Sequence, residues 1–116
     1  MLSLAGSLGA PEMVYVAAIK RYLLFTWRLR KDFSPTEGTD LLVFEAPEPW
    51  GPFSLVYEEA RWEGQAYNPY CPRVPLKWMA EDGLSGWVQF SGAWGEAGQK
   101  NLYYRSNVRP FSLTLA

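Results

Sequence analysis

The sequence predicts a mainly β fold: a single small antiparallel β-sandwich or barrel of about 6–7 strands, with one short helix near residues 75–82. The first observation is the alternation of side chains in residues 20–31, which is typical of a strand. The second is that turn signals rich in glycine and proline recur about every 8–12 residues. At 116 residues, the chain has the length of one domain.

Residues 20–31 carry the strongest strand signal in the chain. Successive side chains of a strand point to opposite faces, so the two alternating sets define an inner and an outer face. We expect the apolar set to form the centre of the core and the other set to face solvent, which describes a half-buried strand. The apolar set is Leu23, Phe25, Trp27 and Leu29, and the other set is Leu24, Thr26, Arg28 and Arg30.

Residues 1–12 are apolar and small, and we expect them to form an N-terminal arm ahead of a β-domain at 13–116. They lack the basic stretch and the longer apolar run of a signal peptide. The arm is expected either to lie on a neighbouring subunit or to be a flexible terminus. Residues 13–19 fit a strand that runs into 20–31, or a short helix that begins at Pro11. No run approaches the roughly 18–20 apolar residues of a membrane span, so we expect a soluble protein.

The middle of the chain alternates between strands and proline-rich connections. We expect a loop at 32–40 because it contains proline, glycine and small polar residues. Strands are expected at 41–46 and 53–63. Between them, residues 46–52 contain three prolines, which predicts a stiff turn that joins no central ladder.

Residues 64–85 are long for a loop in a compact domain, and such loops usually carry function or contain an element. Pro75 can begin the short helix expected at 75–82, and Gly83 can end it. The stretch before this helix is extended and rich in proline and tyrosine, which makes it a candidate functional surface outside the core.

The last third of the chain is predicted to form a hairpin and a final strand. Residues 86–94 and 100–108 read as the two strands of the hairpin, with a glycine-containing turn between them. Residues 111–115 alternate between apolar and polar side chains, which predicts a separate strand.

The chain lacks histidine and a second cysteine, and this excludes several classes of catalytic and metal site. There is no histidine, so zinc sites with histidine ligands and Ser-His or Cys-His nucleophile pairs are excluded from this chain. Cys71 is the only cysteine, so no intrachain disulfide can form. Carboxylate pairs such as Glu45 with Glu58, or Glu81 with Asp82, are not distinguished from ordinary surface acids. We therefore expect a protein that is not an enzyme, with no cofactor and no metal.

Charge is placed unevenly along the chain. Residues 20–31 hold five basic residues and no acid, whereas residues 37–63 hold seven acids and one base. Residues 97–116 hold three basic residues and no acid. We favour neutralisation between neighbouring strands, with complementary patches on successive subunits as a further interpretation. A nucleic-acid interface is disfavoured by the acidic total, and it would use Arg28, Arg30, Arg105 and Arg109.

Several aromatic residues lie in proline-rich turns and in the long connection, which we expect to be outside the core. Trp50 stands between prolines, and Tyr67 and Tyr70 lie in the long connection with Trp78. Exposed tryptophan and tyrosine can stack on sugar rings, but they are equally typical of protein interfaces. We favour an interface because large exposed apolar patches usually mark association.

These observations predict a non-catalytic structural protein that self-associates, as a homo-oligomer or within a larger assembly. The form we expect is a virion component, belonging to a capsid, a decoration or a tail. The alternatives are a carbohydrate-binding module with an aromatic stacking platform and a nucleic-acid-binding β-domain. The candidate interface or binding residues are Arg28, Arg30, Trp50, Tyr67, Tyr70, Trp78, Arg105 and Arg109.

Overall fold

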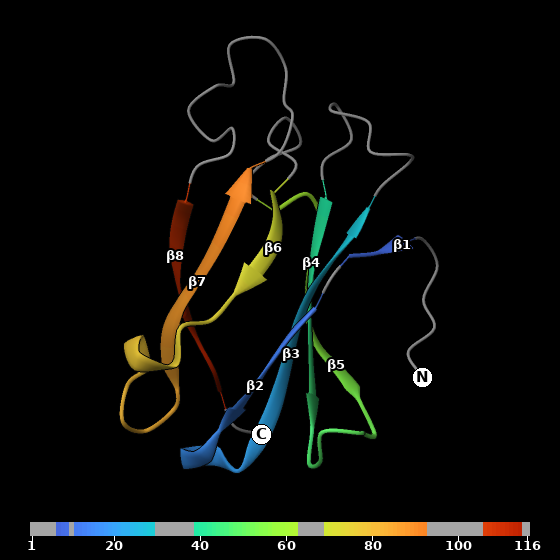
Figure 1. Cartoon of the computed structure of the whole chain (residues 1–116). Coiled ribbons are helices and arrows are strands. Elements are labelled where there is room, and N and C mark those ends of the chain that lie inside the picture. The colour runs from blue at the N-terminus through green and yellow to red at the C-terminus, as the bar shows by residue number, and fades with distance from the viewer. Residues whose placement is uncertain (1–6, 10, 30–38, 63–68, 93–105, 115–116) are drawn as a thin grey trace, which may run out of the picture.

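The computed structural model of the chain describes residues 7–9, 11–29, 39–62, 69–92 and 106–114. These residues form two antiparallel β-sheets, as Figure 1 shows. The two sheets share an apolar core. The predicted mainly β sandwich is therefore confirmed.

The larger sheet has four strand positions. Its central strands are β3 (Arg21–Leu29) and β4 (Thr39–Ala46), and β5 (Ser54–Glu59) pairs with the far side of β4. On the other edge, β1 (Ser7–Leu8) and β2 (Glu12–Val16) pair one after the other with the same side of β3. The two short strands therefore occupy one position, and β5 forms the opposite edge.

The smaller sheet has three strands. Its order is β6 (Pro69–Arg73), β7 (Ser85–Gly92) and β8 (Ser106–Ser112), so that β6 and β8 are its edges. The described ranges contain no α-helix. They contain two single turns of 3-10 helix, η1 (Ala17–Ile19) and η2 (Leu76–Trp78).

The main core lies between the two sheets. Trp62, which follows the end of β5, is fully buried, and its ring centroid lies 4.7 Å from that of Phe90 in β7. Strand β3 contributes Leu23 and Phe25, as the alternation predicted. The full cluster consists of Val14, Val16, Leu23, Phe25, Leu41, Val43, Trp62, Val74, Val88 and Phe90.

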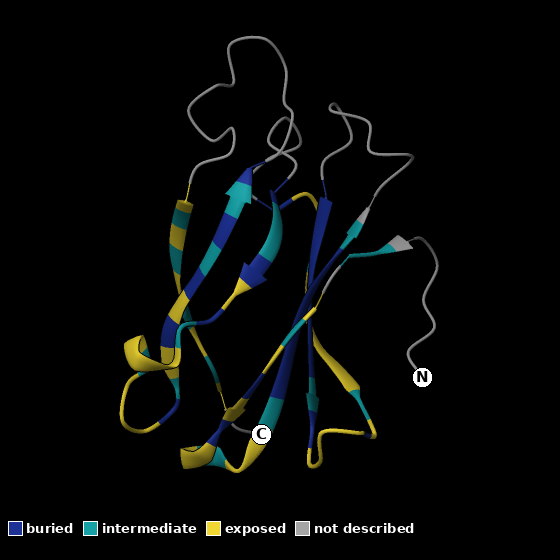
Figure 2. Cartoon of the chain, viewed as in Figure 1, coloured by how far each residue is buried: buried dark blue, intermediate teal, exposed yellow. Residues whose placement is uncertain are grey.

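A second apolar cluster covers the outer face of the larger sheet. Leu24, Leu42 and Phe44 are buried there, with Leu8 and Phe53 packed against them. The expectation that β3 is half-buried is therefore wrong, because residues 23–27 are buried on both faces. Figure 2 shows the consequence for the sheet: β4 is buried along nearly its whole length, whereas β5 is largely exposed.

Several predicted elements change their bounds in the structure. The strand interpretation of 13–19 is confirmed as far as Val16, where η1 begins. The helix expected at 75–82 is present as the single turn η2, and the long connection 64–85 also contains β6. The separation of a hairpin strand from the last strand is wrong, since β8 runs without a break from Ser106 through Pro110 to Ser112.

Part of the N-terminal arm pairs within its own chain. Ser7 and Leu8 pair with β3, and the Gly9 N–H donates to the Trp27 carbonyl oxygen at 2.8 Å. Gly9 lies so close to Trp27 that a β-carbon would stand 2.0 Å from the indole Cε2 atom, which requires glycine here. Residues 1–6, which hold the rest of the predicted arm, lie outside the described residues. Within the described ranges, no helix is long and apolar enough to cross a membrane.

Candidate functional site

A groove opens between edge strands of the two sheets in the described part of the chain. It lies between β5 of the larger sheet and β8 of the smaller one, and we call it the β5–β8 groove. Its volume is about 670 Å³, which falls within the range of about 300–1,000 Å³ that binding sites usually have. Its lining consists of residues 109–114 with Ile19, Leu23, Phe25, Leu41, Val43, Glu45, Val56, Tyr57 and Val88.

The floor of the groove is the main core itself. Leu23, Phe25, Leu41, Val43 and Val88 belong both to the core cluster and to the lining. From the other side, Phe111 packs on the core, with its ring centroid 5.7 Å from that of Phe25. An occupant of the groove therefore contacts the apolar centre of the fold directly.

A β-bulge shapes the rim of the groove on β5. Val43 pairs with Tyr57 and Phe44 pairs with Leu55, so Val56 is an extra residue on the β5 side. Such a bulge twists the strand locally and changes where its side chains point. Val56 and Tyr57 both line the groove, and they are 48% and 47% exposed.

One ion pair spans the groove from β8 to β5. The Arg109 Nη2 atom lies 2.5 Å from Glu59 Oε1, and the Arg109 Nη1 atom donates to Glu59 Oε2 at 3.2 Å. The Tyr57 hydroxyl also donates to Glu59 Oε1, at 2.7 Å. Partial burial by itself raises the pKa of Glu59, but the hydrogen bonds from Arg109 and Tyr57 outweigh it and lower the pKa below its ordinary value. The hydrogen bond to Glu59 raises the pKa of Tyr57.

The lowered pKa of Glu59 predicts an acid-dependent loss of stability. A carboxyl group whose pKa is depressed by folding stabilises the folded state above its ordinary pKa and loses this contribution as the pH falls through the folded value. We expect Glu59→Gln to flatten the fall in unfolding midpoint as the pH drops below about 4.5, the ordinary glutamate pKa, because the folded-state pKa is lower still. Thermal unfolding followed at each pH measures this, and parallel profiles for Glu59→Gln and the wild type would contradict it.

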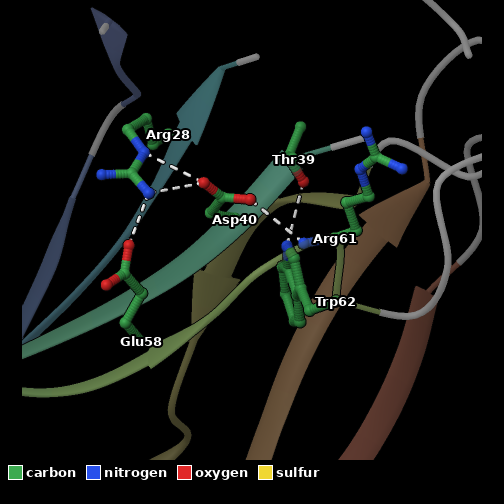
Figure 3. Close-up of polar contacts among 6 residues, drawn as sticks. All are labelled: Arg28, Thr39, Asp40, Glu58, Arg61 and Trp62. Carbon is green, nitrogen blue, oxygen red and sulfur yellow. Dashed lines mark hydrogen bonds and ion pairs between the residues drawn. The ribbon is translucent and has the colours of Figure 1, made fainter. Parts of the chain in front are cut away.

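A second charged cluster lies on the outer face of the larger sheet (Figure 3). Asp40 is 1% exposed and accepts hydrogen bonds from Arg28 Nε at 3.0 Å and Nη2 at 2.6 Å. Its other oxygen accepts from the backbone N–H of Arg61 at 3.0 Å. Glu58 contacts Arg28 from β5, so one guanidinium joins three strands. The hydrogen bond to Asp40 is the main cause that raises the pKa of Arg28.

The structure separates Arg28 and Arg109, the two described arginines of the predicted nucleic-acid set. Arg28 lies on the outer face of the larger sheet, whereas Arg109 reaches Glu59 between the sheets. Arg30 and Arg105 lie outside the described residues. Since Arg28 and Arg109 each pair with acids of other strands, the prediction of neutralisation between strands is confirmed for both.

The three described aromatic residues of the predicted stacking platform are not brought together either. Trp50 is 78% exposed in the turn between β4 and β5, and Trp78 is 45% exposed in η2, at a different place in Figure 1. Tyr70 packs instead on Trp27, with their ring centroids 5.9 Å apart. Tyr67 lies outside the described residues. Binding of sugar by Trp50 or Trp78 alone stays a prediction.

The carboxylates considered for catalysis do not meet across a cleft. Glu45 lines the β5–β8 groove, whereas Glu58 contacts Arg28 on the opposite face of the same sheet. The Oδ1 atom of Asp82 accepts a hydrogen bond from the backbone N–H of Leu84 within the turn before β7. Among the described residues, no three cysteine, aspartate and glutamate side chains gather closely enough to hold a metal ion.

Most residues of the groove were not singled out from the sequence. Of the five candidate residues that the structure describes, only Arg109 lines it. The alternation placed Val56 and Tyr57 on a strand, but their role depends on the bulge and on β5 being an edge, and neither has a clear sequence signal. Comparisons with protein-family models, curated proteins and solved structures found no match to this chain.

Proposed function

We propose that this protein is a non-catalytic structural protein that works by self-association. The observation that carries this proposal is the β5–β8 groove, where a single chain leaves an opening onto the apolar centre of its own fold. Burial of apolar surface contributes roughly 25 cal/mol per Å² and is the main driving force of protein association. A second copy that fills the groove would complete the packing that one chain leaves incomplete.

The Arg109–Glu59 ion pair supports a protein occupant that is uncharged where it meets this pair. Arg109 and Glu59 already pair with each other, so an incoming charge would lose its water without gaining a new counter-ion from this pair. The exposed rim residues Val56 and Tyr57 offer apolar surface and, at the tyrosine, an aromatic ring, which is a common anchor of interfaces.

The setting we propose for this self-association is a repeating assembly, such as the shell, decoration or tail of a virion. A groove on one part of a copy that receives a different part of the next copy makes a heterologous contact. Contacts of this kind build rings or open arrays from identical small domains. A small β-domain that contributes binding surfaces rather than chemistry suits such an array.

Two matched substitutions test whether the groove is the contact. Val56 lines the groove at 48% exposure, and Val108 is 50% exposed on β8 without lining it. We expect Val56→Asp to weaken association by at least about tenfold, because a carboxylate would be buried in an apolar site. Val108→Asp should leave association within about twofold of the wild type. Light scattering with mass determination over a dilution series measures both; equal effects of the two substitutions would contradict the proposal.

A further inference from the structure

We propose that residues 1–6 of a second copy fill the β5–β8 groove by adding as a strand to the free edge of β5. This inference rests on the proposed self-association and names the partner segment. It is an example of strand addition, in which backbone hydrogen bonds to a sheet edge give affinity and alternate side chains fill pockets below.

Strand β5 is the edge that is open to a new strand. A proline has no N–H to donate to a ladder, and prolines on edge strands protect them from pairing. Both edges of the smaller sheet contain proline: Pro69 and Pro72 in β6, and Pro110 in β8. On the larger sheet, Pro11 separates β1 from β2, whereas the six residues of β5 include no proline and pair only with β4 among the described strands.

Residues 1–6 have the chemistry that the groove requires. Their side chains carry no charge, which suits a groove whose lining is mainly apolar and whose Arg109 already pairs with Glu59. Leu2 and Leu4 are two residues apart, so both would point to the same face of a strand. Placed along the free edge of β5, that face would point into the groove beside Val56 and Tyr57. The segment is six residues long, and so is β5.

The geometry of the sheet requires the segment to come from another copy. Residues 1–6 lead directly into β1, which pairs with β3 on the edge opposite to β5. Three strand spacings, about 14 Å, separate β1 from β5, and six extended residues reach at most about 20 Å. A segment that crossed its own sheet would have about two residues left to pair with β5. A neighbouring copy has no such restriction. Because β1, into which the segment leads, and β5 are on opposite edges of the sheet, each copy would fill the groove of the next.

A pair of matched double substitutions tests the role of the segment. Leu2→Asp with Leu4→Asp places two carboxylates on the face that enters the groove, whereas Ser3→Asp with Ala5→Asp places the same charges on the other face. We expect the first variant to lose association by at least about 100-fold and the second to stay within about fivefold, because only the first buries charge. Neither should change the unfolding midpoint of the dilute chain. Equal weakening by both variants would overturn the inference.

A cross-link between two different copies tests the contact independently of affinity. One protein carries Leu4→Cys and the other Val56→Cys, both with Cys71→Ser so that each has a single thiol. A short bis-maleimide added to the mixture should give a heterodimer that neither protein gives alone. The same two cysteines placed in one chain should cross-link between chains and yield few intramolecular products. Absence of the heterodimer, or mainly intramolecular product, would overturn the inference.

These results separate the inference from the proposed function. If the wild-type chain stays a monomer at millimolar concentration, both are overturned. If it associates and Val56→Asp weakens association, but the leucine double variant associates like the wild type, the proposed function stands and the segment is not the occupant. If native mass spectrometry shows a bound small apolar molecule that occupies the groove and blocks the cross-link, strand addition is overturned.

Discussion

Replacement of Trp62 by alanine is expected to lower the free energy of unfolding by about 3–5 kcal/mol, which is the usual loss for a large buried aromatic side chain. Trp62 has no exposed surface, packs against Phe90 and lies in the core shared by both sheets. Its indole Nε1–H donates to the Thr39 hydroxyl at 3.0 Å, and that hydroxyl donates in turn to the Pro69 carbonyl oxygen. The substitution therefore removes packing and also breaks a chain of hydrogen bonds between the sheets. Chemical denaturation of the dilute monomer measures the loss.

Trp50→Ala is the matched control for this prediction. Trp50 is 78% exposed in the turn between β4 and β5, so its loss should change the free energy of unfolding by no more than about 0.5 kcal/mol. The loss of unfolding free energy for Trp62→Phe should lie between the losses for Trp50→Ala and Trp62→Ala. This variant keeps an aromatic ring but leaves the Thr39 hydroxyl without the indole donor. Similar stabilities of Trp50→Ala and Trp62→Ala would contradict the position of Trp62 in the core.

Asp40→Ala is expected to cost about 2–3 kcal/mol of folding free energy, because it leaves buried donors without their acceptor. The Asp40 carboxylate accepts from both the Arg28 guanidinium and the backbone N–H of Arg61. This loss is at the low end of what breaking a buried ion pair usually costs, because the Arg28 side chain is 22% exposed and still contacts Glu58. Denaturant unfolding of the variant measures the loss.

Glu58→Gln is the control for the outer charged cluster. The Glu58 side chain is 43% exposed, and an exposed ion pair usually contributes about 0–1 kcal/mol, so this variant should remain nearly as stable as the wild type. The stability of Asp40→Asn should lie between those of Glu58→Gln and Asp40→Ala, because the amide oxygen can still accept one of the hydrogen bonds. If Glu58→Gln is as destabilising as Asp40→Ala, the exposed Glu58 contributes as much stability as the buried Asp40. That result would contradict the prediction that Asp40 contributes most of the stability of this cluster.

The period-two pattern was sufficient to predict the fold class and the position of most strands. It placed Leu23 and Phe25 in the core correctly, because alternation on β3 fixes which side chains share a face. It could not show that Leu24 on the other face would also be covered, since the cover comes from Leu8 and Phe53, which are distant in sequence. Whether a face of a strand meets solvent is a property of the packed molecule.

The groove could not be predicted from the sequence for a similar reason. Strand order decides which strands are edges, and nothing in residues 54–59 marks β5 as an edge. The bulge that makes Val56 an extra residue depends on its register with β4. Charge was more informative: the contrast between the basic stretch and the acidic stretch predicted neutralisation between neighbouring strands. Arg28 shows this with Asp40 and Glu58, although the sequence did not identify the pairs or the added backbone N–H of Arg61.

The mass of the wild-type chain in solution is the most direct test of self-association through the β5–β8 groove. Light scattering with mass determination, from micromolar to millimolar concentration, should show a mass that rises above the 13.2 kDa of one chain and approaches whole multiples of it. The rise is expected because a copy whose groove is empty exposes apolar surface that a second copy can bury. A mass that stays at 13.2 kDa over the whole range would contradict the account.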